Sequence, residues 1–376
     1  MEDRYPFTTS EEERAQRRAQ RIADRRRRQR EQRIAMLKRL ALAGAAVLVL
    51  LAVILSVMGG KKEKSEAVPA VNEVETVPPE TVEPPEVKEP EPAPAEPEPE
   101  IYHADKTVAT LHPGEEIDSD YAILIDLQSG TVIAEKNSDT VISPASMTKI
   151  LTLLTAVEEI EERGLSLSDT VPITYEITDY CYVNGCSVAG FMIGEEVPVR
   201  DLLYGTILPS GAEAAMGLAI YVSGGQDEFV KLMNEKVEEL GLSKTARFTN
   251  CVGLYHEKNV CTVYDMAMIL KAAMDNELCR QVLGTKIYEI PASEMHPEGM
   301  ILSNWFIRRI EDKDTGAVKV IGAKTGYVSE AGSCAASCAA DEAGNEYICV
   351  TGKAGGTWKC IYDHVDLYKG YVSGAD

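Results

Sequence analysis

The stretch PASMTK, residues 144–149, brings a serine and a lysine to the start of one expected helix. Pro144 is typical of a first helical turn, and apolar residues continue at helical spacing as far as Gly164, a residue type that commonly follows a helix end. Side chains three positions apart share a helical face, so the Lys149 amine falls within proton-transfer reach of the Ser146 hydroxyl. Lys149 is therefore the candidate base for Ser146, whose oxygen lies near the positive end of the helix dipole.

Two further motifs follow at wide intervals, SGA at residues 210–212 and KTG at residues 324–326. Taken singly, each residue has an ordinary explanation. Lys149 could be an exposed helix lysine, Ser146 a helix cap, and the KTG motif a polar strand end. The ordered set of three is instead typical of enzymes that form an acyl group on an active-site serine. The sequence therefore predicts an enzyme.

The segments around these motifs predict an α/β fold. An apolar run at residues 121–125, a Ser129-Gly130 turn and alternating residues at 131–134 indicate a β-hairpin. Helical periodicity covers residues 200–285. Near the C-terminus we expect strands at residues 318–322, 333–340 and 347–351, followed by a closing helix at residues 357–368. The hairpin and the last strands should form one antiparallel sheet flanked by helices, with an all-helical subdomain inserted between them.

The N-terminal region has a different composition. Residues 1–39 are rich in arginine although the whole chain has a formal net charge of -22, and residues 40–58 carry no charge. That uncharged length suits one transmembrane helix, and the positive-inside rule makes residues 1–39 a basic cytoplasmic arm. A cleaved signal peptide is the alternative. We expect a single-pass protein of the cell membrane with its folded domain outside the cell.

Residues 59–105 are rich in proline and glutamate and predict a disordered linker, which leaves residues 106–376 as the folded domain. No nucleic-acid partner is expected for the basic arm. Its charges are not interleaved with aromatic residues, and the run Glu11-Glu12-Glu13 would weaken phosphate binding.

Nine cysteines lie in the folded domain. Disulfides are permitted outside the cell, and the pairs Cys181/Cys186 and Cys251/Cys261 are the two hypotheses that loop spacing favours. Cys334 and Cys338 are expected on one strand, too far apart to bond to each other. Zinc is disfavoured because no close Cys-x-x-Cys pair or paired histidines occur.

Residues from about 116 to 370 resemble the serine D-alanyl-D-alanine carboxypeptidases, the low-molecular-mass penicillin-binding proteins. Besides the three motifs, the resemblance rests on segments DLLYG at 201–205, LPSG at 208–211, FTN at 248–250 with Gly253-Leu254, and GAKTGY at 322–327. It implies the fold of the penicillin-binding proteins and β-lactamases. It also implies a carboxypeptidase that removes the terminal D-alanine from peptidoglycan stem peptides and reacts covalently with β-lactams.

The resemblance also implies a role for each motif residue. Ser146 would be the nucleophile, Lys149 its proton acceptor, and Ser210 a relay that carries a proton toward the leaving D-alanine. Lys324 and Thr325 would bind the terminal carboxylate of the substrate.

Two further roles concern the backbone. Gly326 would leave room for the peptide along the strand. The N–H groups of Ser146 and Tyr327 would form the oxyanion hole. No cofactor or metal is implied.

One position departs from the family pattern. The second motif usually ends in asparagine, and here Ala212 replaces it. The loss of one such side-chain hydrogen bond costs about 1 to 3 kcal/mol. A weakly active or inactive module that binds cell-wall peptide is therefore one alternative. A β-lactamase is another, although no Glu-x-x-Leu-Asn pattern for a deacylating base occurs between Lys149 and Lys324.

Several other residues are possible contributors to the cleft. Asn250 and His256 lie in a loop that the family places near the substrate. Tyr175, Tyr180 and Tyr182 could line the same groove or belong to loops and core. For Trp305 and Trp358 we favour a packing role.

Overall fold

The computed structural model describes residues 103–372. The predicted arm and transmembrane helix, and all but the last three positions of the predicted linker, lie outside these residues. Within the described range, no helix has both the length and the apolar character needed to span a membrane.

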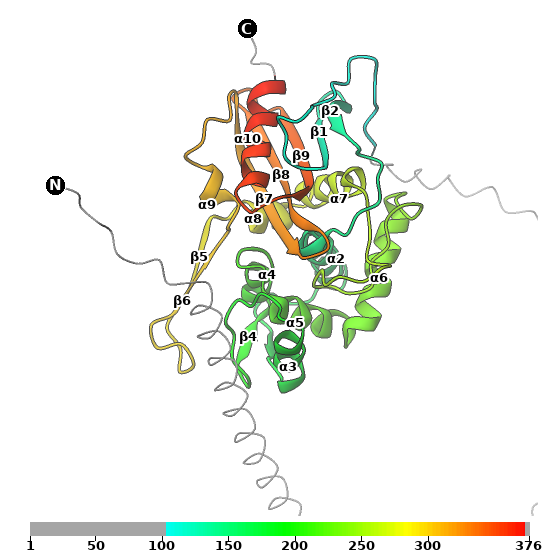
Figure 1. Ribbon diagram of the computed structural model, residues 1–376. Coiled ribbons are helices and arrows are strands. Elements are labelled where there is room, and N and C mark those ends of the chain that lie inside the picture. The colour runs from blue at the N-terminus through cyan, green and yellow to red at the C-terminus, as the bar shows by residue number, and fades with distance from the viewer. Residues whose placement is uncertain (1–102, 373–376) are drawn as a thin grey trace, which may run out of the picture. The chain divides into compact units, whose positions relative to one another are not determined.

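A five-stranded antiparallel sheet forms one half of the molecule, with the strand order β2-β1-β9-β8-β7 (Figure 1). The strands are β1 (Tyr121–Asp126), β2 (Thr131–Lys136), β7 (Val318–Val328), β8 (Gly332–Asp341) and β9 (Glu346–Ala354). The predicted hairpin and C-terminal strands are thus confirmed, and they share one sheet. The KTG motif lies within β7, which is the edge strand.

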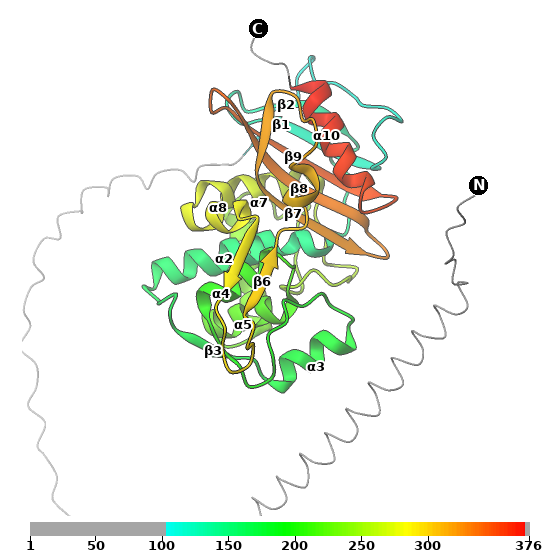
Figure 2. The same ribbon diagram turned by 90° about the vertical axis from the view of Figure 1, so that its left-hand side faces the viewer.

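Helices cover both faces of this sheet, as Figure 2 shows. On one face, Ala122 and Leu124 of β1 pack with Leu367 of α10 (Lys359–Tyr371). The alternate residues of β1, Ile123 and Ile125, belong to the larger core that contains α7 (Val263–Asp275). This alternation is the period of two that buries both faces of a strand.

The other half of the molecule is mainly helical, as the periodicity predicted. Its helices are α2 (Thr148–Glu162), α3 (Tyr175–Val183), α4 (Val199–Ile207), α5 (Ala212–Ser223) and α6 (Gln226–Glu239), and α8 (Glu277–Gly284) follows α7. Figure 1 shows α3, α4 and α5 grouped below the sheet.

The prediction of an all-helical subdomain was wrong in one respect. A two-stranded sheet joins β3 (Thr170–Pro172) and β4 (Glu196–Pro198) within the helical part. Val171 pairs with Val197, and both are buried, so a β-branched pair holds two strands of only three residues each. A second hairpin, β5 (Ile287–Ile290) with β6 (Met300–Ser303), precedes the short helix α9 (Ile307–Ile310).

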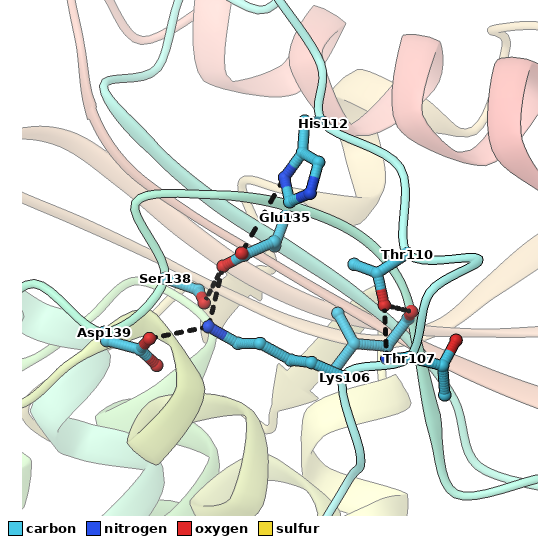
Figure 3. A network of polar contacts seen from close by, with 8 residues as sticks. Lys106, Thr107, Thr110, His112, Glu135, Ser138 and Asp139 are labelled. Atoms are coloured by element: carbon cyan, nitrogen blue, oxygen red, sulfur yellow. Dashed lines mark hydrogen bonds and ion pairs between the residues drawn. The ribbon is translucent and has the colours of Figure 1, made fainter.

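A polar network fastens the N-terminal segment of the described chain to the end of β2 (Figure 3). The Lys106 ammonium lies 2.9 Å from a Glu135 oxygen and 2.7 Å from an Asp139 oxygen. Thr110 donates from its hydroxyl to the Val132 carbonyl at 2.9 Å. The network fixes where the chain enters the sheet, and its residues are absent from the walls of the catalytic-motif cleft described below.

Candidate active site

Ser146 lies in a three-residue 3₁₀ turn, Ala145–Met147, immediately before α2, and not in the α-helix itself. Ala145 has a φ of 49°, in the left-handed region that non-glycine residues rarely adopt. Such strained backbone persists only where surrounding structure imposes it. The predicted helix therefore starts later than Pro144, while Gly164, with a φ of 60°, follows its end as predicted.

Two glycines from distant segments hold this turn. A Cβ at Gly253 would lie 2.1 Å from the Ala145 carbonyl oxygen, and a Cβ at Gly326 would lie 3.0 Å from the Ser146 nitrogen. Neither position has room for a side chain. Gly326 thus lets β7 approach the backbone of the turn that carries Ser146. This is a second reason for glycine at this position, in addition to the role in peptide binding that the resemblance implied.

The Lys149 side chain is buried, and its amine lies 3.3 Å from the Ser146 hydroxyl oxygen. The amine also donates a hydrogen bond of 2.6 Å to the Val252 carbonyl. Burial lowers the pKa of Lys149 from its usual value to about 8. The lowered pKa increases the share of Lys149 amines that carry a free lone pair near neutral pH, as a general base requires.

Ser210 lies in the loop between α4 and α5 and lines the same cleft as Ser146 and Lys149. It has a φ of 64°, and its hydroxyl accepts a hydrogen bond of 2.9 Å from the Lys324 amine. The structure therefore brings the second and third motifs into direct contact.

Lys324 is itself buried, with its amine bonded to the Thr325 carbonyl at 2.6 Å as well as to Ser210. Burial, with a smaller contribution from the neighbouring charge of Lys149, holds the pKa of Lys324 well below its usual value. A neighbouring like charge disfavours protonation, so the Lys149 charge adds to the effect of burial on Lys324. A full positive charge at Lys324 is therefore costly.

The segment after α3 packs directly on the second motif. Ala212 donates from its N–H to the Ser187 carbonyl at 2.8 Å, and the Glu213 carboxylate accepts from the Gly190 N–H at 2.8 Å. Glu213 is buried, and burial raises the pKa of its carboxyl group. Its carboxylate anchors a loop, and it does not supply the side-chain amide that Ala212 lacks.

These elements enclose a cleft of about 970 Å³. Its walls include the predicted catalytic residues Ser146, Lys149 and Ser210, with Thr325, Gly326 and Tyr327 from β7. Lys324 reaches this group through its bond to Ser210 and does not itself line the cleft.

The other candidates divide into two groups. Tyr180, Asn250 and His256 line the cleft, whereas Tyr175 and Tyr182 do not. Asn250 accepts hydrogen bonds at its Oδ1 from the N–H groups of Val252, Gly253 and Leu254, so it shapes the loop that carries the carbonyl partner of Lys149.

An aromatic and cationic cluster on the cleft wall was missed from the sequence. The Arg309 guanidinium lies 5.5 Å from the ring centre of Trp305 and 5.4 Å from that of Trp358. Both tryptophans remain 46% exposed or more, so neither belongs to the core, although both pack against Arg309. Arg309 and Trp305 line the cleft. No sequence signal places this short helix, α9, beside the KTG strand.

All nine cysteines are free in the structure. The predicted Cys251/Cys261 disulfide is absent because the Cys251 sulfur faces Met216 and Gln226. Cys181 and Cys186 lie close together but are not bonded.

Comparison with known proteins identifies the family. Residues 106–354 match the sequence signature of the D-alanyl-D-alanine carboxypeptidases, and the chain belongs to that family. It is 33% identical over 213 residues to the D-alanyl-D-alanine carboxypeptidase DacF of Bacillus subtilis (strain 168), a match that covers 57% of this chain and 52% of that protein. It is also 33% identical over 217 residues to the D-alanyl-D-alanine carboxypeptidase of Streptomyces sp. (strain K15), covering 55% of this chain and 71% of that protein. The chain spans about half the length of the first of these relatives.

Solved structures show the same fold. A variant of the Streptomyces K15 DD-transpeptidase superposes with a TM-score of 0.62 at 27% identity, covering 69% of this chain and all of that one. Penicillin-binding protein 5 from Haemophilus influenzae superposes with a TM-score of 0.60 at 25% identity, covering 68% of this chain and 70% of that one.

Proposed function

We propose that this protein is a serine D-alanyl-D-alanine carboxypeptidase that removes the terminal D-alanine from peptidoglycan stem peptides through an acyl group on Ser146. The observation that carries the proposal is the contact of 3.3 Å between the Ser146 hydroxyl and the buried Lys149 amine. Family membership supports the same reaction.

In the acylation step, neutral Lys149 takes the proton of the Ser146 hydroxyl while the oxygen attacks the carbonyl carbon of the penultimate D-alanine. The Val252 carbonyl holds the amine in place through the transfer. Collapse of the tetrahedral intermediate breaks the peptide bond, and the leaving nitrogen receives a proton relayed through Ser210. Water then hydrolyses the Ser146 ester and releases the shortened peptide.

The negative oxygen of the intermediate would be stabilised by the N–H groups of Ser146 and Tyr327. Support comes from Gly326, whose missing side chain lets β7 approach the Ser146 nitrogen. Because β7 is the edge strand of the sheet, its outer side can accept an extended peptide as an added strand.

The terminal carboxylate of the substrate needs a cation. Lys324 is a poor source of charge because it is buried beside Lys149, although with Thr325 it can still donate hydrogen bonds. Arg309 lines the same cleft, and its planar guanidinium has the geometry that binds a carboxylate through two parallel hydrogen bonds. We assign charge attraction of the carboxylate to Arg309, and short-range hydrogen bonding to Thr325.

Release of D-alanine from a stem peptide ending in D-alanyl-D-alanine tests the function, with Ser146→Ala as the control. Release by the native protein alone supports the proposal. A well-folded protein that binds the peptide without releasing D-alanine would instead indicate a binding module. Ala212 is the reason to consider that outcome, because it replaces the usual asparagine of the second motif. Rapid turnover of penicillin would indicate a β-lactamase.

Residues 40–58 form the membrane anchor of this proposal, with residues 1–39 in the cytoplasm and the enzyme domain outside the cell. Support comes from the uncharged length of the segment and the arginine-rich arm before it.

β-Lactams would act as covalent inhibitors at Ser146.

A further inference from the structure

The C-terminal end of α3 brings two thiols together beside the cleft. Gly185, with a φ of 62°, donates from its N–H to the Tyr182 carbonyl at 3.2 Å, and Cys186 donates from its N–H to the Cys181 carbonyl at 2.9 Å. This pair of hydrogen bonds defines a Schellman motif, and in that motif the side chains at the positions of Cys181 and Cys186 commonly meet.

One of these thiols belongs to the cleft. Cys186 lines it together with Ser146, Lys149 and Ala212. The next residue, Ser187, accepts the Ala212 N–H at 2.8 Å, which fixes the thiol beside the second motif. Cys181 is buried behind Cys186, so an outside reagent meets Cys186 first.

We propose that Cys181 and Cys186 form a redox site of the cleft, where a low-molecular-mass disulfide oxidises the pair to an intramolecular disulfide and changes the acylation of Ser146. This inference rests on the proposed function of Ser146 and adds a means of regulating it.

The chemistry is two successive thiol–disulfide exchanges. The Cys186 thiolate attacks one sulfur of the disulfide reagent, whose sulfur–sulfur bond breaks and releases one thiolate. Cys181 then loses its proton to solvent, attacks the Cys186 sulfur and releases the second thiolate. The two cysteines give up two electrons, and the reagent is reduced to two thiols.

Electrostatics assign the order of attack. The interaction between the two thiols holds the pKa of Cys186 below its usual value while raising the pKa of Cys181, and Cys186 is also the thiol that lines the cleft. Thiolate character determines which sulfur attacks first. Cys186 is thus the attacking thiol and Cys181 the resolving one.

Oxidation should alter the titration of Lys149. Burial lowers the pKa of Lys149, and negative charge on Cys186 is the largest opposing effect. The other groups that face the lysine are Cys251, Glu213 and Cys181, which also raise its pKa, and Lys324 on β7. A disulfide removes the thiolate charge, so Lys149 should lose its proton at lower pH.

The test uses the full-length protein treated with oxidised glutathione. We expect the intact mass to fall by two hydrogen atoms, non-reducing peptide mapping to join Cys181 to Cys186, and the acylation rate with a β-lactam to reach half its maximum at lower pH. Reduction should reverse all three changes.

Single variants sharpen the test. Cys181→Ser should trap a glutathione adduct on Cys186, because no resolving thiol remains. Cys186→Ser should take no adduct there, and its acylation profile should match that of the oxidised native protein. Cys360→Ser is the matched control, since Cys360 also lines the cleft but contacts the Thr357 carbonyl, and it should respond as the native protein does.

Free thiols at Cys181 and Cys186 after treatment would overturn the proposal, as would a mapped disulfide that leaves the acylation profile unchanged. A reduced protein that is never acylated would contradict the proposed function. In that case the peptide mapping alone would show whether Cys181 and Cys186 form a disulfide.

Discussion

At the residue scale, the proposed acylation depends on a neutral form of one lysine. Lys149 is buried, and its amine bonds to Ser146 and to the Val252 carbonyl. A buried amine is easier to deprotonate because the charged form loses its hydration. Burial of Lys149 therefore costs folding free energy, but it also lowers the pKa of the amine that is proposed to act as the base.

The first prediction concerns pH. Because only neutral Lys149 can accept the serine proton, the acylation rate should rise with pH through a midpoint of about 8. Stopped-flow acylation by a β-lactam between acidic and alkaline pH would measure it. A rate that falls over this range would show that the lysine works in its charged form.

The second prediction concerns Arg309. Arg309→Leu should raise KM for a peptide substrate more than it lowers kcat, because the guanidinium is assigned to attraction of the carboxylate and not to proton transfer. Arg308→Leu is the matched control, since Arg308 is exposed and bonds to Ser303. Equal effects of the two variants on KM would refute the assignment.

The third prediction concerns Gly326. A Cβ there would meet the Ser146 nitrogen at 3.0 Å, and the strand or the nucleophile turn must shift. Gly326→Ala should lower stability by about 1 to 3 kcal/mol, as overpacking typically does, and slow acylation. Gly356→Ala meets no atom nearer than 3.9 Å and serves as the control. Urea unfolding and acylation kinetics would measure both, and a neutral Gly326→Ala would show that the turn has slack.

At the element scale, short loops place the catalytic groups. The segment after α3 packs on the start of α5 through the bonds of Glu213 and Ala212. Elements far apart in sequence meet at Ser146, because β7 and the loop with Gly253 both press on one 3₁₀ turn.

The fourth prediction concerns Glu213. Glu213→Ala removes the acceptor of the Gly190 N–H and should lower stability by about 1 to 3 kcal/mol, the usual cost of an unmade buried hydrogen bond. It should also slow acylation by loosening the loop that carries Cys186. Glu235→Ala, on the exposed face of α6, is the control. Denaturant midpoints that are the same for both variants would contradict the anchoring role.

The sequence predicted the elements whose signals are local. An apolar run, a turn and a short alternating segment predicted the β1–β2 hairpin. Helical periodicity predicted α4 to α7, and the order of the motifs predicted residues that line the cleft. The β3–β4 pair was missed because three residues are too few to show alternation. The strained φ of Ala145 and the Arg309 cluster were missed because contacts between distant segments create them.

At the scale of the whole molecule, the sheet and the helical half meet along the cleft, and the edge strand β7 carries the KTG motif to it. The N-terminal residues add a further proposal, in which residues 40–58 hold this enzyme at the membrane.

The fifth prediction tests that anchor. Deletion of residues 1–58 should move the protein from the membrane fraction to the soluble fraction, because it removes the uncharged segment that is proposed to span the bilayer. Immunoblotting of fractionated cells would show it. A full-length protein found in the soluble fraction would refute the proposed anchor and would leave the proposed carboxypeptidase activity unaffected.

The most direct test of the central claim is the intact mass of the full-length protein after exposure to penicillin, beside Ser146→Ala. The account predicts a stable acyl adduct on the native protein, mapped to Ser146, and none on the variant. A folded native protein without an adduct, or an equal adduct on Ser146→Ala, would contradict it.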